Sequence, residues 1–305
     1  MKTVALAGGV GGAKLADGLA HLLPSSDLTI VVNTGDDFEH LGLYISPDLD
    51  TVCYTLADLA DPIKGWGRKN ETWNFLNNLQ ILKGPDWFQI GDKDLATHIE
   101  RTRRLKNSES LSKVTEDFCK LWKVGPKVLP MSDDPVRTIV HTNEGRLPFQ
   151  EYFVAKRCEP EVKGFEFDGI TDAEPAPGIL EAIKMADLVV FCPSNPWVSI
   201  DPILNLKGIK QALKNKMVVA VSPIIQGKTI KGPAAKMYQD MDIKPSALAV
   251  YKHYHDILCA FVIDDLDANL AGNISIPVLV TNTIMKNRQD RISLAKKIIE
   301  FCTKL

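Results

Sequence analysis

Short runs of apolar residues alternate along the chain with stretches in which apolar residues recur every three or four positions. The runs are continuous rather than alternating, and we expect buried strands at Thr3–Ala7, Leu28–Val32, Leu188–Cys192, Met217–Val221, Ala260–Ile263 and Val278–Val280. A helical period follows the first run, over Lys14–Leu23. Continuous apolar strands separated by helices are typical of a parallel sheet that is covered on both faces. The pattern therefore predicts an α/β fold, a Rossmann-like and mostly parallel doubly wound sheet.

The region between residues 52 and 125 has a different pattern, without a strand-like run. Its helical stretches are Thr51–Leu59, Thr72–Leu82, Leu95–Arg103 and Ser110–Leu121. Residues 126–170 return to a strand-like pattern in KVLPM, RTIVHT and EYFVAK. No linker rich in Pro, Gly or Ser separates two halves. We therefore expect a single α/β domain over residues 1–305, with a helical insertion at 52–125 after the second strand.

Composition and charge remove several classes of function. The chain has 305 residues, of which 45% are hydrophobic, and a formal net charge of −2, so we expect no nucleic-acid partner. No segment approaches the roughly 18 apolar residues of a membrane span, and the first apolar run is too short for a signal peptide. The six cysteines form no CxxC pair, which fits a reducing compartment. We expect a cytoplasmic protein that does not bind membranes.

A glycine-rich turn follows the first expected strand, in ALAGGVGGAKLADGL. Gly8, Gly9, Gly11 and Gly12 open a helix, and Lys14 follows. Glycine lets backbone N–H groups turn toward an anion, and the helix N-terminus adds its positive end. Lys14 stands where a G-x-G-x-x-G motif needs glycine, and no Gly-Lys-Ser/Thr is present. The alternative is a plain tight turn, but four glycines in five residues before a lysine favour an anion site.

Polar residues and carboxylates gather at the end of the second expected strand. They are Asn33, Thr34, Asp36, Asp37, Asp48 and Asp50, the last two at an expected helix start in SPDLDT. Adjacent acids are often only solvated, and we interpret Glu39 in that way. This strand end, however, lies beside the glycine turn, in the crevice where doubly wound folds bind ligands. Hard oxygen ligands there indicate Mg²⁺, with candidate ligands Asp36, Asp37, Asp48 and Asp50.

Two later strands end in a serine close to a proline. LVVFC leads to Ser194, Asn195 and Pro196, and MVVAV leads to Ser222 and Pro223. Small polar side chains on a fixed backbone suit a phosphate or a base edge, and the alternative is a proline-rich turn. Two such ends on neighbouring strands favour a shared ligand.

Two further stretches stay open between a site and a simple cap or turn. They contain Gln89, Asp92, Asp94 and His98 in the first and Ser132, Asp133, Asp134 and Arg137 in the second. His253 and His255 lack the spacing of a helical metal pair, and we interpret them as surface residues. No G-x-S-x-G or HExxH motif occurs.

These motifs together resemble the CofD family, the 2-phospho-L-lactate transferases of coenzyme F420 biosynthesis. The resemblance rests on AGGVGGAKLADGL, VVNTGDDFEHLGLYISPDLDT, GDKDLATH, PMSDDPVRT, PSNPWVSIDPIL and SPIIQGKTIKGPAAK, in order up to about Asp267. It implies a Rossmann-like, Mg²⁺-dependent transferase that tends to form homodimers.

The resemblance also implies a reaction. A guanylyl-activated three-carbon acid, lactyl-2-diphospho-5′-guanosine or its enolpyruvyl counterpart, gives its phospholactyl or phosphoenolpyruvyl group to the terminal ribityl hydroxyl of the deazaflavin Fo. GMP leaves and (dehydro) coenzyme F420-0 forms. By position Asp50 is the family's deazaflavin contact and the catalytic candidate, a role that competes with metal binding. Gln89 stands where the family usually has a basic residue, so any contact with Fo there is neutral.

The remaining assignments follow from the same resemblance. We place the diphosphate on Gly8–Gly12 with Lys14. Guanine and ribose are expected along the later strand ends and the second strand, at Asn33, Thr34, Ser194, Asn195, Pro196, Ser222 and Pro223.

Two other functions serve as alternatives. The gluconeogenesis-factor proteins that resemble CofD bind a nucleotide sugar and act as regulators, but their second-strand region usually has a glycine/serine run after the acid pair. Here that region is NTGDDFEHLGLYISPDLDT. An NAD-dependent oxidoreductase would need an intact G-x-G-x-x-G motif and an acid at Asn33. Both comparisons favour the transferase.

Overall fold

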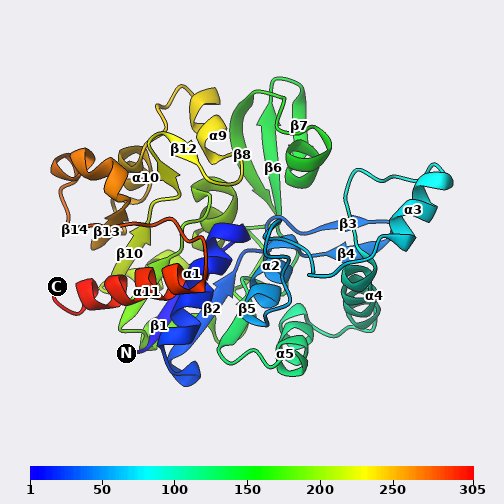
Figure 1. Cartoon of the computed structure of the whole chain (residues 1–305), viewed down its shortest axis with the longest axis horizontal. Helices are drawn as coiled ribbons and strands as arrows, with labels where there is room; N and C mark the ends of the chain where they lie inside the picture. Colours follow the sequence, from blue (N-terminus) through cyan, green and yellow to red (C-terminus); the bar gives the residue numbers. More distant parts are fainter.

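The computed structural model describes residues 1–305 and is built around a seven-stranded sheet in the order β14-β13-β10-β9-β1-β2-β5 (Figure 1). The strands are β1 (Thr3–Ala7), β2 (Leu28–Val32), β5 (Lys127–Pro130), β9 (Leu188–Phe191), β10 (Met217–Val221), β13 (Ala260–Ile263) and β14 (Val278–Val280). Every neighbouring pair in this sheet is parallel. The predicted Rossmann-like α/β fold is therefore confirmed.

Helices cover both faces of this sheet, as the continuous apolar strands require. On β1, Val4 and Leu6 belong to one apolar layer, while Ala5 and Ala7 belong to the other. The helices of the first layer are α6 (Ile179–Met185), α7 (Asp201–Leu204), α8 (Ile209–Leu213) and α10 (Ala247–Tyr254). Those of the second are α1 (Gly9–Leu22), α2 (Pro47–Leu56), α5 (Leu111–Leu121) and α11 (Arg288–Cys302).

The chain leaves the sheet between β2 and β5. It first forms a hairpin of β3 (Phe38–His40) and β4 (Leu43–Ile45), which the sequence pattern did not predict. The two turn residues, Leu41 and Gly42, have φ of 54° and 72°, the conformation that matches the twist of a two-residue hairpin. The helices α3 (Asn74–Ile81) and α4 (Asp92–Lys106) then project beyond the sheet on the right of Figure 1.

A second, antiparallel sheet has the order β7-β6-β8, with bounds Gly145–Pro148, Arg137–Thr142 and Val162–Asp168. The strand expected over EYFVAK is wrong, because Glu151–Ala155 forms a turn of π-helix. Phe149 and Phe153 stack with their ring centroids 5.5 Å apart. Their spacing of four residues belongs to a helix, and a strand would place its side chains on a period of two.

The remaining elements are short connections between strands and helices. They are β11 (Ile224–Ile225), β12 (Lys228–Thr229), α9 (Ala234–Asp240), the 3₁₀ segments Ser25–Asp27 and Asp265–Asn273, and a π-turn at Pro196–Ile200. None of the helices has both the length and the apolar composition needed to cross a membrane.

The contact between α1 and α11 depends on a glycine. A side chain on Gly18 would place its first carbon 2.2 Å from the carbonyl oxygen of Arg291. Beside it, the fully buried Asp17 accepts a hydrogen bond from Nη1 of Arg291 at 2.9 Å. The small residue lets the two backbones approach, and the ion pair then fixes their register.

We therefore expect Gly18→Ala to lower the free energy of unfolding by roughly 1–3 kcal/mol, because the new methyl group overlaps backbone atoms that cannot rotate away. Urea unfolding followed by circular dichroism measures this change. Gly272→Ala is the matched control, because no atom lies within 4 Å of its added carbon. Equal unfolding midpoints for the two variants would contradict the close contact.

Candidate functional site

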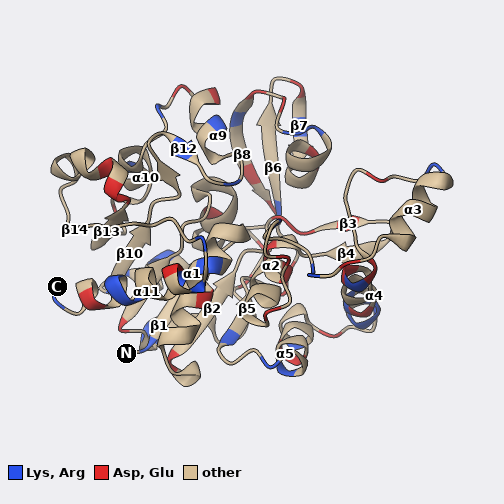
Figure 2. Ribbon diagram, in the orientation of Figure 1, with Lys and Arg blue, Asp and Glu red and all other residues tan.

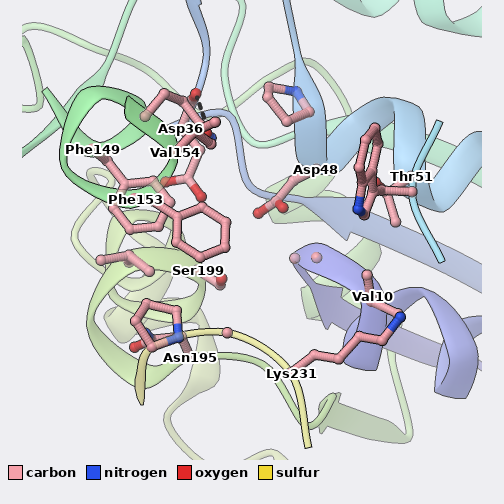
Figure 3. A pocket seen from close by; sticks show the side chains of 18 of the residues that line it. Val10, Asp36, Asp48, Thr51, Phe149, Phe153, Val154, Asn195, Ser199 and Lys231 are labelled. Carbon is pink, nitrogen blue, oxygen red and sulfur yellow. Dashed lines mark hydrogen bonds between the residues drawn. The ribbon is translucent and has the colours of Figure 1, made fainter. Parts of the chain in front are cut away.

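The carboxyl ends of the central strands open into a cleft of about 680 Å³ (Figure 3). It lies where β1 separates β2 from β9, the point at which the strand order reverses. The expected site residues that line it are Gly8, Gly9, Gly11, Asp36, Asp48, Asp50, Gln89, Ser194, Asn195 and Pro223. Those that do not line it are Gly12, Lys14, Asn33, Thr34, Asp37, Pro196 and Ser222.

The glycine turn is pressed against a carboxylate. A side chain on Gly8 would place its first carbon 2.5 Å from Oδ2 of Asp48 and 2.7 Å from Cβ of Ser199. Gly9 has a φ of +61°, which L side chains rarely adopt. The first two glycines of the motif are therefore required by the turn itself and by its contact with Asp48.

The other two glycines bring α1 close to the end of β9. An added carbon on Gly11 would lie 2.3 Å from the carbonyl oxygen of Pro193, and one on Gly12 would lie 2.6 Å from Oγ of Ser194. Ser194 Oγ donates to the Gly8 carbonyl at 2.8 Å and accepts from the Gly8 N–H at 3.1 Å. Ser194 therefore locks the turn in place. No side chain caps the start of α1, and its first turn holds no acid.

Asp36 and Asp48 both point into the cleft, from different elements (Figure 3). Burial raises the pKa of Asp36 well above its ordinary value, and the charge of Asp48 raises it further. Burial also raises the pKa of Asp48 to about 6, although a hydrogen bond from Asn33 works in the opposite direction. Oδ1 of Asp36 is buried without a hydrogen-bond partner. The cleft therefore holds two neighbouring carboxylates that lack a cationic partner.

Asn33 orients one of these carboxylates from outside the cleft. Its Nδ2 donates to Oδ2 of Asp48 at 2.9 Å and to the carbonyl of Val198 at 3.0 Å, while its Oδ1 accepts from the N–H of Gly35 at 2.9 Å. All the polar atoms of this buried side chain are therefore used. Asn33 contributes by holding Asp48.

Asp37 and Lys14 also turn away from the cleft. Asp37 accepts from Ser46 Oγ at 2.8 Å. Burial raises its pKa to about 7, although the charge of Arg137 lowers it in part. Nζ of Lys14 donates to the carbonyl of Met285 at 2.8 Å. The structure therefore does not bring Lys14 to the glycine turn, even though the two are adjacent in sequence.

Asp50 faces a group of side chains around α4. The sequence motifs left the roles of Asp94 and His98 open and did not reveal a role for Arg101 or Tyr54. Both of its oxygens accept from the guanidinium of Arg101, and Nδ1 of His98 lies 3.7 Å from its Oδ2. On the other side of His98, Nε2 lies 3.4 Å from Asp94. Tyr54 donates to Asp94 at 2.7 Å. The signal that could have revealed this group is the spacing of 94, 98 and 101, which places all three on one helix face.

Asp50, Asp94 and His98 offer ligand atoms within 4.8 Å of one another, a separation that a metal site allows. The cation of Arg101 opposes that use, because it already occupies Asp50 and its Nη1 lies 3.3 Å from His98 Nδ1. A second cation at this point would be repelled. We therefore regard Asp36 and Asp48 as the better metal candidates.

Two pairs of aromatic rings line the cleft. Phe149 and Phe153 form one pair, and Trp87 and Phe88 form the other, with the ring centroids of the second pair 5.8 Å apart. Lys231 reaches in from the loop after β12 (Figure 3) and donates to the backbone carbonyl of Ile63 at 3.3 Å, and also to that of Lys64. None of these side chains was among the expected site residues, because each reaches the cleft through tertiary packing.

Comparison with known protein families shows which family this chain belongs to. The family model described as 2-phospho-L-lactate transferase CofD matches residues 3–295. The chain belongs to the CofD family. It is a transferase of the CofD type, so the resemblance inferred from the motifs is confirmed.

Relatives of the CofD family carry two different names at similar levels of identity. The 2-phospho-L-lactate transferase of Methanocaldococcus jannaschii is 41% identical over 98% of both chains. The phosphoenolpyruvate transferase of Streptomyces griseus is 41% identical over 92% of this chain and 94% of that protein. A third relative, the phosphoenolpyruvate transferase of Thermobifida fusca, is 44% identical over 88% of each. Overall identity therefore does not separate the two names.

The fold of this CofD protein also occurs in a distant structure. A crystal structure of a UPF0052 family member from Bacillus halodurans superposes with a TM-score of 0.67, covering 97% of this chain and 99% of that one, at 16% identity. At that identity the likeness concerns the fold alone, and it supports the Rossmann-like assignment.

Asp48 should make the stability of the metal-free protein depend on pH. Its pKa rises from 3.8 to about 6 on folding, so the folded state binds more protons between these values. The free energy of unfolding should therefore fall as pH rises from about 4 to about 7, by an amount on the order of 2 kcal/mol from this group. Thermal melting in the presence of EDTA measures it.

The slope should be reduced in Asp48→Asn, whose amide does not titrate. Asp256→Asn is the control, because that carboxylate is 85% exposed. If Asp48→Asn and Asp256→Asn melt with the same pH dependence, burial of Asp48 does not destabilise its charged form.

Proposed function

We propose that this chain transfers a phospholactyl or phosphoenolpyruvyl group from a guanosine diphosphate-activated three-carbon acid to the terminal ribityl hydroxyl of the deazaflavin Fo. The products are GMP and (dehydro) coenzyme F420-0. The observation that carries the proposal is the family match over residues 3–295, which includes every segment that lines the cleft.

The chemistry requires one P–O bond to form and one to break. The acceptor oxygen attacks the phosphorus that bears the three-carbon acid, the anhydride bond breaks, and GMP leaves with the bridging oxygen. Such reactions depend mainly on positioning and on neutralising the charge of the phosphates. The uncapped start of α1, with the backbone N–H groups of Val10 and Gly11, supplies part of that neutralisation.

The carboxylates of the cleft fit a divalent cation. Asp36 and Asp48 are both buried, neither has a cationic partner, and Oδ1 of Asp36 has no hydrogen-bond partner. Oxygen ligands of this kind suit Mg²⁺. We propose that these two residues would hold the ion, which would neutralise charge on the diphosphate. Asp37 lies outside the cleft and Asp50 is engaged by Arg101, so we propose a smaller ligand set than the sequence suggested.

The acceptor fits the part of the cleft that contains Asp50. Gln89 lines the cleft next to Trp87 and Phe88, whose faces suit a flat tricyclic ring. Asp50 lines the same cleft and carries no metal in this proposal, so its carboxylate is available to accept the proton or hydrogen bond of the ribityl hydroxyl. The guanosine part of the donor would lie along Ser194, Asn195 and Pro223.

The decisive experiment incubates the protein with Fo, Mg²⁺ and each activated donor, and weighs the products by mass spectrometry. We expect one transfer product together with GMP, and no GMP when Fo is omitted. Asp50→Asn should lower the turnover number by roughly 100-fold or more, because the amide cannot take a proton.

Three results would contradict this function. GMP release at an equal rate without Fo would indicate a hydrolase. Full turnover by Asp50→Asn would remove Asp50 from the reaction. Tight binding of a nucleotide sugar without any transfer product from either donor would favour the regulatory alternative.

The cation that contacts the donor phosphates should be Lys231. Its side chain lines the cleft next to Val10 (Figure 3), whereas Lys14 faces Met285. We expect Lys231→Ala to raise KM for the donor by about tenfold, the usual effect of losing one charge-assisted hydrogen bond. Lys228→Ala, an exposed lysine of β12 outside the cleft, is the matched control. Identical donor KM values for the two variants would exclude this role for Lys231.

A further inference from the structure

Every fully buried position on the helix α4 is polar or charged, and of its apolar residues only Leu105 packs, partly buried, against an apolar layer of the sheet. Its charges of both signs are visible along the helix in Figure 2. The buried positions are Asp94, Thr97, His98, Arg101 and Thr102. Hydrophobic burial normally holds a surface helix in place, so the face that α4 presents to the molecule must serve another purpose. That face lies against α2, whose first turn carries Asp50.

Arg101 is the most deeply placed charge on this face. It is 2% exposed, and it is the largest of the fully buried side chains. Its two terminal nitrogens donate to the two oxygens of Asp50, with Nη1 at 3.0 Å. Burial works against the charged guanidinium, but the carboxylate of Asp50 raises the pKa of Arg101 above its ordinary value. Asp50 is its only carboxylate partner within ion-pair distance.

The two members of this pair differ in their access to the cleft. Asp50 lines the cleft, and Arg101 does not. Arg101 therefore reaches any bound molecule only through its neighbours that line the cleft, Asp50 and His98, and only Asp50 is its ion-pair partner. The planar fork of a guanidinium fixes the plane of a carboxylate, which a single point charge cannot do. The pair is also enclosed, because the side chain of Arg101 is 2% exposed and that of Asp50 is 8% exposed.

Stability alone is a weak reason to keep such a pair. Removing two charges from water costs about as much as their attraction returns, and apolar replacements are often equally stable. One member of this ion pair is a carboxylate that lines the cleft, so the pair is better explained by the position in which it holds that carboxylate.

We propose that Arg101 is a positioning residue that fixes the carboxylate of Asp50 toward the acceptor hydroxyl and keeps Asp50 out of the metal site. This inference rests on the proposed function. It assigns a task to α4, which carries the guanidinium that makes Asp50 a fixed hydrogen-bond acceptor on the Fo side of the cleft.

The test compares Arg101→Lys, Arg101→Ala and wild type. We expect Arg101→Lys to lower the turnover number roughly 10- to 100-fold, the range found when the partner of a site residue is lost. The dissociation constant for the donor, measured without Fo, should not change, because the glycine turn is intact. Low-millimolar guanidinium chloride should restore turnover to Arg101→Ala, and the same concentration of NaCl should not. Loss of fold stability alone would also lower turnover without changing the dissociation constant, but guanidinium chloride would not then restore turnover, so the rescue distinguishes the two explanations.

Arg104→Gln is the matched control on the same helix. Arg104 pairs with Glu109 and Asp117 rather than with Asp50, so its loss should leave turnover unchanged. Wild-type turnover by Arg101→Lys would overturn the inference, as would a loss of donor affinity equal to the loss of turnover. If Arg101→Ala does not fold, the lysine variant decides. Absence of product from wild type with both donors is a separate result, which would overturn the proposed function itself.

Discussion

The cleft buries the neighbouring carboxylates of Asp36 and Asp48 without a cationic partner, and the groups around them reduce the free-energy cost of that burial. A charged carboxylate in a low-dielectric interior is strongly destabilised unless hydrogen bonds or counter-charges compensate it. Asn33 donates a hydrogen bond to Asp48, and the start of α1 faces the same space. One oxygen of Asp36 is left without a hydrogen-bond partner. The remaining cost in folding free energy is offset by burial of the apolar layers on the two faces of the sheet.

Asp36, Asp48 and Asp50 lie within fifteen residues but have different surroundings. Asp36 and Asp48 lack cations, whereas Asp50 faces a guanidinium. In the proposed function this separation assigns the cation and the acceptor hydroxyl to different carboxylates of one segment, so the two roles do not compete. The sequence left the role of Asp50 open between these two, and the position of Arg101 favours the acceptor.

The sequence was sufficient where the physical signal is local. Continuous apolar runs revealed the strands of the sheet apart from Lys127–Pro130, which was seen only as part of a strand-like region, and their carboxyl ends located the cleft. Residues that reach the cleft through helix orientation were less accessible. Lys14 stands next to the glycines, but the helical turn carries it toward Met285. Arg101 belongs to no motif and becomes visible only when α4 is placed against α2.

The positive start of α1 and the negative carboxylates of the cleft differ in how easily their charge can change. Backbone N–H groups carry a partial positive charge that neither pH nor a side-chain substitution removes. The opposing charge of Asp36 and Asp48 changes when a proton binds and, in the proposed function, when a metal ion binds. The positive charge at the start of α1 is therefore constant, whereas the negative charge of Asp36 and Asp48 varies. Lys231 adds a constant positive charge to the cleft, so the part of the field that varies comes from Asp36 and Asp48, and neutralising those two carboxylates would strengthen the attraction for a phosphate-bearing molecule.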